Sequence, residues 1–296
     1  MSTPHLENTN YHFKSRKARY FPSEGSTLKP KKRLGQVFLK NKAFLSKIIK
    51  AGEISSKDVI LEIGPGTGVL TEALLQTRAR VIAIEKDPQL VQFLKNHFRD
   101  NPNLKIIQGD IRDLLNSNSQ FPISKQITNS NYKVVGNIPY YLASHLIQLL
   151  LELKHQPKVI ILMIQKEVAQ RIIAQPPQMN LLAAAVQFYS QPKIICFVPK
   201  SAFWPQPKVD SAIIKLIPMP FPRKRESQFF QIVKAGFSHP RKLLISNLSQ
   251  NLKIPKNQLQ TIFQNNNLSL NSRAQNLSIS KWEKLVIALK NKINRL

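Results

Sequence analysis

The chain has 296 residues, and its 44 Lys and Arg against 16 Asp and Glu give a net charge of +28 at pH 7. A hydrophobic content of 42% supports a sizeable core and excludes wholesale disorder, and the length fits one large domain with a smaller one. So strong a positive charge points to a polyanionic partner, with nucleic acid ahead of an anionic membrane surface. It argues against a small neutral substrate as the sole partner.

Cysteine content and hydropathy exclude further classes of protein. Cys196 is the only cysteine, so an intramolecular disulfide and four-thiolate zinc or iron–sulfur sites are excluded. The longest apolar runs, such as 159–164, are far shorter than the ~20 residues that span a bilayer, and no signal peptide is evident. We therefore expect a soluble, cytoplasmic protein. Residues 1–33 carry eight basic and two acidic residues and predict a disordered basic arm, with an organelle transit peptide as the alternative.

Residues 34–220 alternate between strand-like and helix-like patterns. Short apolar runs predict strands at 59–63, 80–84, 104–107, 133–136 and 159–164. Helical spacing occupies 69–78, the segment after Pro88, and 141–153. This alternation predicts an α/β fold with a parallel sheet. Residues 116–131 are polar and predict a surface loop insertion, and two more strands are expected at 194–198 and 209–216.

The C-terminal segment, 221–296, differs from the rest in charge and pattern. It carries 14 basic and two acidic residues, a net charge of +12 in 76 residues. Its patterns are helical throughout and are interrupted at Pro240 and Pro255. We predict a small basic helical domain.

A glycine-rich turn follows the first predicted strand. Gly64, Gly66 and Gly68 are spaced G-x-G-x-G, which differs from the dinucleotide pattern because Val69 stands at the sixth position. The Lys-Ser/Thr ending of a phosphate-binding loop is also missing. Glycines let a backbone approach a ligand closely, and a plain tight turn is the alternative.

Acidic residues follow the next two strands. Glu85 lies 21 residues after Gly64, where a carboxylate can accept hydrogen bonds from both hydroxyls of a ribose. Asp110 follows the third strand and can accept from the amino group of an adenine. The alternatives are a solvated carboxylate beside Lys86 and a helix N-cap. Because strand ends form the ligand crevice of α/β sheets, the glycine turn and both acids together predict an adenosine-bearing ligand.

Two further motifs suit chemistry on a flat base. In 137–140, the side-chain oxygen of Asn137 and a carbonyl fixed by Pro139 can hold an exocyclic amino group, and Tyr140 can stack on the ring. The alternative is an Asx-Pro turn with a core tyrosine. In the proline-rich stretch 203–211, Phe203 can cover the other face of the base, and hydrophobic packing of Phe203 and Trp204 is the alternative.

Other chemistries lack their patterns. The six histidines show neither H-x-x-x-H nor H-E-x-x-H spacing, so we expect no metal site. No G-x-S-x-G elbow is present, and Cys196 lies in an apolar run typical of a buried thiol.

The ordered motifs resemble the ribosomal RNA adenine N6,N6-dimethyltransferase family of the kasugamycin-resistance (KsgA/RsmA) type. The resemblance extends from about Lys32 to near the C-terminus. The matching segments are 35–39, 64–68, Glu85, 109–110, 137–140, 165–168, 203–211, 241–242 and 273–278. Together these segments are highly specific, although the glycine turn alone is not.

The resemblance implies a class I S-adenosylmethionine-dependent methyltransferase with a Rossmann-like sheet in 34–220 and an RNA-binding helical domain in 221–296. It implies cofactor binding by Val37, Leu39, Gly64, Gly66, Glu85, Asp110 and Asn137, and catalysis by Asn137, Pro139, Tyr140 and Phe203. The implied reaction is dimethylation of N6 on two adjacent adenosines near the 3′ end of small-subunit rRNA, as part of small-subunit biogenesis. The implied partner is the immature small subunit, and we expect a monomer.

The chain departs from the family pattern at Val37, where the family usually has Asn or His. A contact through the backbone would survive this change, whereas a side-chain contact would be lost. The insertion at 116–131 and the basic N-terminus are also additions to the family pattern.

Two alternative functions stay open. One is the large-subunit dimethylase that confers macrolide resistance, which the long C-terminal segment opposes. The other is a non-catalytic ribosome-assembly or transcription factor, which the complete 137–140 motif opposes.

Overall fold

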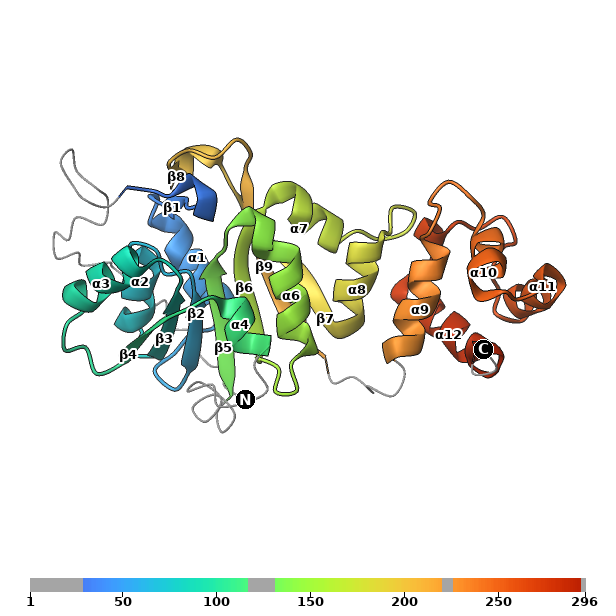
Figure 1. Cartoon of the computed structure of the whole chain (residues 1–296), viewed down its shortest axis with the longest axis horizontal. Helices are drawn as coiled ribbons and strands as arrows, with labels where there is room; N and C mark the ends of the chain where they lie inside the picture. The colour runs from blue at the N-terminus through green and yellow to red at the C-terminus, as the bar shows by residue number, and fades with distance from the viewer. Residues whose placement is uncertain (1–28, 117–130, 220–225, 294–296) are drawn as a thin grey trace, which may run out of the picture.

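The computed structural model describes residues 29–116, 131–219 and 226–293. Most of the predicted N-terminal arm, the insertion at 117–130 and Arg223 to Arg225 lie outside the described residues. A central sheet has helices on both faces, and a group of helices lies at one end of the molecule (Figure 1).

The main sheet has seven strands in the order β4-β3-β2-β5-β6-β9-β7, and a separate two-stranded sheet joins β1 to β8. The strands are β1 (Phe38–Leu39), β2 (Val59–Ile63), β3 (Arg80–Glu85), β4 (Leu104–Gln108), β5 (Tyr132–Asn137), β6 (Val159–Gln165), β7 (Ser190–Val198), β8 (Phe203–Trp204) and β9 (Ser211–Pro218). Strands β2 to β6 are parallel, as predicted, whereas β9 runs antiparallel to both β6 and β7. The last strand begins at Ser211, two residues later than predicted, because the segment up to Asp210 forms a loop in which Val209 is exposed.

The helices are α1 (Ala43–Gly52), α2 (Val69–Gln76), α3 (Pro88–His97), α4 (Ile111–Asn116), α6 (Ala143–Glu152), α7 (Lys166–Ile172), α8 (Leu181–Tyr189), α9 (Glu226–Gly236), α10 (Leu244–Leu252), α11 (Lys256–Asn265) and α12 (Ile279–Ile293). Helices α2, α3 and α6 occupy the predicted positions, although α2 ends two residues early, where Arg78 takes a left-handed conformation. The predicted interruptions of the C-terminal segment are confirmed, since the turn after α9 contains Pro240 and Pro255 immediately precedes α11.

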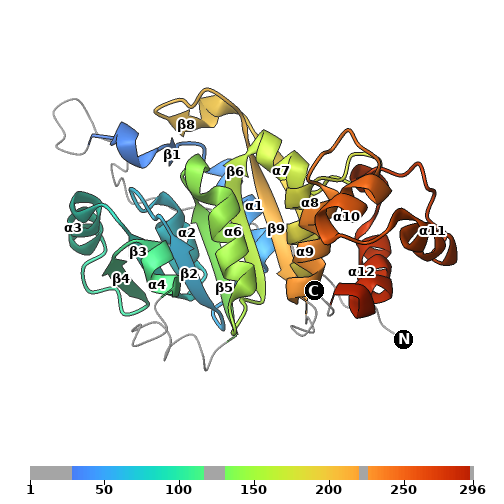
Figure 2. The same ribbon diagram turned by 45° about the vertical axis from the view of Figure 1, so that its right-hand side comes forward.

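Strand side chains alternate between two hydrophobic clusters, as the two-residue period of a strand requires. Leu61 and Ile63 of β2 face the cluster that contains the inner faces of α6, α7 and α8. Ile60 of the same strand faces the opposite cluster, which α1 and α2 cover. Both faces are therefore buried, and Figure 2 shows α6 on one side of the sheet and α1 on the other. The carboxyl ends of the parallel strands are left to form a site.

Helices α9 to α12 pack against one another and against α8. The rings of Phe188 on α8 and Phe229 on α9 stack, with centroids 3.8 Å apart. Trp282 of α12 lies against Gly236, where an added Cβ would come within 2.5 Å of the indole ring. One hydrophobic cluster thus runs without a break from the sheet into these helices. In the described part of the chain, no helix combines the length and hydrophobicity needed to cross a membrane.

Candidate active site

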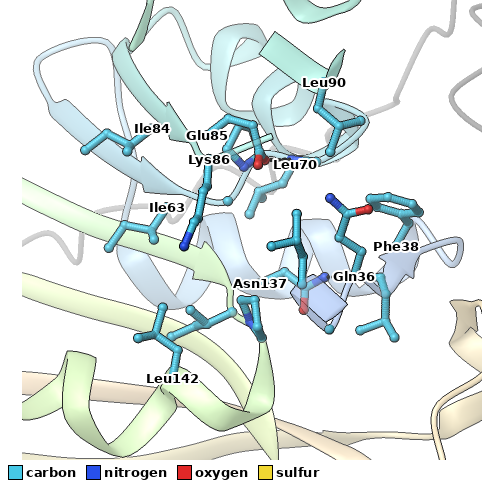
Figure 3. Close-up of a pocket in the computed structure, with 18 of the residues that line it drawn as sticks. Gln36, Phe38, Ile63, Leu70, Ile84, Glu85, Lys86, Leu90, Asn137 and Leu142 are labelled. Atoms are coloured by element: carbon cyan, nitrogen blue, oxygen red, sulfur yellow. Dashed lines mark hydrogen bonds between the residues drawn. The ribbon is translucent and has the colours of Figure 1, made fainter. Parts of the chain in front are cut away.

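A cavity lies at the carboxyl ends of β2, β3 and β5 and is closed on one side by the segment 34–39 (Figure 3). Eight predicted site residues line it, and these are Val37, Leu39, Gly64, Gly66, Glu85, Asp110, Asn137 and Pro139. The structure therefore brings together residues that are up to a hundred positions apart in sequence, as the strand order predicts.

The glycine turn presents backbone to this cavity. Gly66 has φ of +60°, and a Cβ there would lie 3.0 Å from the Phe38 ring. A side chain would therefore crowd Phe38 in a backbone conformation that L-residues rarely adopt. The turn is consequently a surface of main-chain groups between β2 and α2.

Glu85 is almost fully buried at the end of β3. Its Oε2 accepts a hydrogen bond of 3.1 Å from the Gly66 N–H, and its Oε1 accepts one of 2.9 Å from the Asp87 N–H. Burial raises the pKa of the Glu85 carboxyl above its usual value. A carboxylate held in this way keeps free lone pairs for a second pair of donors, such as adjacent hydroxyls.

Asp110 is fully engaged by basic neighbours. Its oxygens accept from Nε and Nη2 of Arg112 at 3.0 and 2.6 Å, from the Arg112 N–H at 3.0 Å, and from Nζ of Lys86 at 2.9 Å. The hydrogen bonds from Arg112 hold the pKa of Asp110 well below its usual range. The helix-cap alternative is thus realised, and four bonds fill the carboxylate's positions. An adenine amino group would have to replace Lys86 or Arg112 there.

Asn137 is anchored through its amide nitrogen. Nδ2 donates a hydrogen bond of 2.9 Å to the carbonyl of Val37, whereas Oδ1 is buried and has no partner among the described residues. A buried acceptor without a donor is costly, and this one belongs to a residue that lines the cavity. Asn137 is therefore prepared to accept a hydrogen bond from a bound ligand.

Tyr140 and Phe203 do not line the cavity. The Tyr140 hydroxyl is 2.8 Å from Oγ of Ser211, and burial raises the pKa of this half-buried phenol. Phe203 is only 1% exposed, because β8 pairs with β1 and the ring packs into the core under them. Phe203 thus packs as the hydrophobic alternative expects, and its position over a base stays a prediction.

Comparison with known proteins shows which family the chain belongs to. A family model described as ribosomal RNA adenine dimethylase matches residues 27–290. The ribosomal RNA small subunit methyltransferase A of Dehalococcoides mccartyi is 38% identical over 270 residues, covering 89% of this chain and 90% of the relative. That of Acaryochloris marina is also 38% identical, over 86% of this chain and 95% of the relative. The chain belongs to the ribosomal RNA adenine dimethylase family.

Solved structures agree with this membership. A dimethyladenosine transferase from Plasmodium falciparum is 28% identical, with a TM-score of 0.69 over 86% of this chain and 98% of that one. The 23S rRNA methyltransferase ErmE has the same TM-score at 21% identity over 86% of this chain and 99% of that one, so it shares the fold. The predicted class I methyltransferase sheet is confirmed. As a ribosomal RNA adenine dimethylase, the chain is an rRNA methyltransferase that uses S-adenosylmethionine.

The cavity of this dimethylase fits such a cofactor. The unpartnered Oδ1 of Asn137 and the buried carboxylate of Glu85 are acceptors, and Gly64 and Gly66 have no side chain to stand between backbone and ligand. Apolar side chains from several elements flank these groups, including Ile63, Ile84 and Leu142 (Figure 3). A few fixed polar groups within apolar walls are typical of a cofactor site.

Sequence reasoning missed how the segment over the cavity is held. Nζ of Lys31 contacts Oδ1 of Asp87 at 2.7 Å, and Nε2 of Gln36 donates to Oδ2 at 3.0 Å. The Lys31 N–H in turn donates to Oε1 of Gln36 at 2.8 Å. Asp87 also caps α3 through the Gln89 N–H. Asp87 follows Glu85 by two residues, and this E-x-D-P sequence is the signal that could have pointed to it.

Proposed function

We propose that this enzyme dimethylates N6 of two adjacent adenosines near the 3′ end of small-subunit rRNA. We place the reaction on the immature small ribosomal subunit, in the cytoplasm, with the enzyme acting as a monomer. The similarity to proteins named ribosomal RNA small subunit methyltransferase A supports this target. The observation that carries the chemistry is the buried, unpartnered Oδ1 of Asn137 at the cavity.

In this proposal the cavity holds S-adenosylmethionine, which supplies a methyl group on a sulfonium centre. Glu85 accepts from the ribose hydroxyls, and Gly64 and Gly66 approach the ligand through their backbone. Val37 and Leu39 contribute from the covering segment, and Asp110 accepts from the adenine amino group once Lys86 or Arg112 gives way.

The target adenine binds beside the cofactor, at the end of β5. Oδ1 of Asn137 accepts a hydrogen bond from the N6 amino group and orients its lone pair for in-line attack on the methyl carbon. The Pro139 carbonyl accepts from the Leu142 N–H at 3.0 Å and keeps a second lone pair for the same amino group. Tyr140 stacks on the extruded base. The amino proton becomes acidic only as positive charge develops, so no strong base is required.

We further propose that 34–220 forms the methyltransferase domain and that 221–296 binds rRNA. Arg241 and Lys242 are exposed in the turn between α9 and α10. Asn247 braces this turn, because its Nδ2 donates to the carbonyls of Gly236 and His239 at 2.7 and 2.9 Å. Basic side chains on a rigid turn are suited to grip phosphates.

The decisive experiment is methyl transfer to ribosomal subunits that lack these modifications. Small and large subunits are incubated separately with the enzyme and labelled S-adenosylmethionine, and the modified nucleosides are identified. We expect dimethyladenosine in the small subunit alone. Label in the large subunit would favour the macrolide-resistance alternative, and tight small-subunit binding without any label would favour a non-catalytic assembly factor.

A further inference from the structure

A second hollow lies beside the end of β6, and neither the cofactor nor the target base occupies it in the function proposed above. Its volume is about 350 Å³, at the lower end of the range for small-molecule sites. Three lysines line it, Lys166, Lys200 and Lys208, together with the acidic Glu167 and Asp210. These residues come from the start of α7 and from the loop between β7 and β9.

The hollow adjoins the proposed position of the target base. Gln165, on its wall, is paired across the sheet with Ser211, whose Oγ is 2.8 Å from the Tyr140 hydroxyl. The Lys166 N–H donates a hydrogen bond of 3.0 Å to the carbonyl of Asp210, which precedes Ser211. A nucleotide joined to a base on Tyr140 would therefore lie close to this hollow.

Charge in the hollow is available to an anion. Within 29–116, 131–219 and 226–293, no ion pair engages the ammonium group of Lys166, Lys200 or Lys208. Oδ1 of Asp210 already accepts a hydrogen bond of 3.0 Å from the Lys200 N–H, so this carboxylate holds the loop in place. The three lysines therefore outnumber the two acids, and among the described residues none of the three is in an ion pair.

Apolar surface accompanies these cations. Val209, on the wall, is 44% exposed, and Phe197 is 48% exposed with Nζ of Lys166 5.0 Å from its ring centroid. Exposed rings and aliphatic groups beside lysines suit a nucleic acid, which offers a phosphate to the cation and flat surfaces to the apolar groups. A divalent metal is less well served, because the described residues hold no group of three or more His, Cys, Asp or Glu that could bind one.

We propose that this hollow binds the phosphodiester next to the target adenosine, with Lys200 and Lys208 on the phosphate and Lys166 supporting it. This inference rests on the proposed function, since it places the flanking nucleotide of that same RNA. The hollow would act as a register site, because a phosphate held beside Tyr140 determines which base reaches Asn137.

The test is a double-mutant cycle on RNA affinity. The probe is a single-stranded oligoribonucleotide with two adjacent adenosines, made with native linkages or with neutral methylphosphonates flanking the first adenosine. The variant is Lys200→Ala with Lys208→Ala, and Lys57→Ala with Lys154→Ala is the matched control. Lys57 and Lys154 are exposed and precede the amino ends of β2 and β6, whereas the hollow lies at the carboxyl end of β6. Replacing them changes the net charge by the same amount as replacing Lys200 and Lys208.

We expect the Lys200→Ala, Lys208→Ala variant to bind the native probe about tenfold more weakly than the control. Its slope of log affinity against log salt should be shallower by about 0.7, as for one lost phosphate contact. The neutral probe should bind the variant and the control equally. Equal losses with both probes, or no loss relative to the control, would overturn the inference. Methyl transfer by the parent enzyme to small subunits is measured in parallel, so failure of the proposed function is distinguished from failure of this site.

Discussion

The carbonyl oxygen of Val37 accepts a hydrogen bond of 2.9 Å from Nδ2 of Asn137, a residue one hundred positions later. This contact joins the segment that covers the cavity to the end of β5. It leaves Oδ1 of Asn137 as the only polar atom of that side chain still without a partner among the described residues. The contact that residue 37 makes with Asn137 uses its backbone carbonyl, which valine supplies as well as Asn or His would.

Val37→Asn should therefore leave the enzyme nearly unchanged. We expect S-adenosylmethionine affinity and the rate of methyl transfer within about twofold of the parent, because the side chain adds no required hydrogen bond. Calorimetry and initial rates provide the measurement. A change of tenfold or more in either quantity would show that the side chain at 37 has a direct role.

Asn137→Ala should abolish methyl transfer and leave RNA affinity largely intact, because RNA binding depends on distributed Lys and Arg. Asn137→Asp keeps the shape but turns an oxygen toward the Val37 carbonyl, so it should also be inactive. Single-turnover rates and filter binding are compared for both variants. Methylation at the parent rate by either one would remove Asn137 from the mechanism.

Glu85→Ala should weaken S-adenosylmethionine binding by about ten- to a hundredfold, since charge-assisted hydrogen bonds are worth roughly 1.5–3 kcal/mol. Glu85→Gln keeps one acceptor and should lose less affinity. The measurement is isothermal calorimetry, and RNA affinity is the control, which should stay unchanged. Unchanged cofactor affinity in the alanine variant would refute the ribose assignment.

Glu62 should make stability depend on pH. This side chain is fully buried on β2, accepts from the Thr71 hydroxyl at 2.7 Å, and burial raises its pKa to about 8. The unfolded chain releases this proton near pH 4.5, whereas the folded chain keeps it until about pH 8. Between these values the folded state binds more protons, so stability falls as pH rises, by up to about 1.4 kcal/mol per unit.

Glu62→Gln removes this titration. Urea unfolding at pH 5, 6.5 and 8 should show the difference between variant and parent growing in the variant's favour as pH rises. Parallel pH profiles for the two proteins would mean that Glu62 ionises normally in the folded state.

Replacing both Arg241 and Lys242 with Ala should make the salt dependence of small-subunit binding shallower. Each lost phosphate contact reduces the slope of log affinity against log salt by about 0.7–0.9, so we expect a change of about one to two units. Cofactor affinity should not change, because neither residue lines the cavity. Lys57→Ala with Lys154→Ala serves again as the charge-matched control. Parallel slopes would indicate that the pair only solvates the surface.

Much of the sheet could be predicted because its signals are local. The strands around Leu61, Ile82 and Val134 are apolar runs bounded by turns, and Glu85 and Asp110 mark where two strands end. The pairing of β1 with β8 could not be predicted in this way, since strands of two residues have no periodicity. The burial of Phe203 follows from that pairing, so the sequence could offer hydrophobic packing only as one of two alternatives.

The polar contacts of the site were less accessible to sequence reasoning. The bond between Lys31 and Asp87 links residues 56 positions apart, and nothing in either local pattern marks the other as a partner. Arg112 beside Asp110 was visible in sequence, but only the helical turn after β4 shows that it wraps the carboxylate. Such contacts depend on how elements meet, which short-range spacing does not encode.

The stack of Phe188 on Phe229 has a consequence for any attempt to separate the C-terminal helices from the sheet. Because the hydrophobic cluster crosses from the sheet to α9 and α12, a chain ended after β9 would leave aromatic rings of α8 in water. We therefore expect the C-terminal helices and the sheet to stabilise each other across this shared core. A chimera that takes these helices from a relative would therefore need matching side chains on α8, so the helices are not an interchangeable module of this chain.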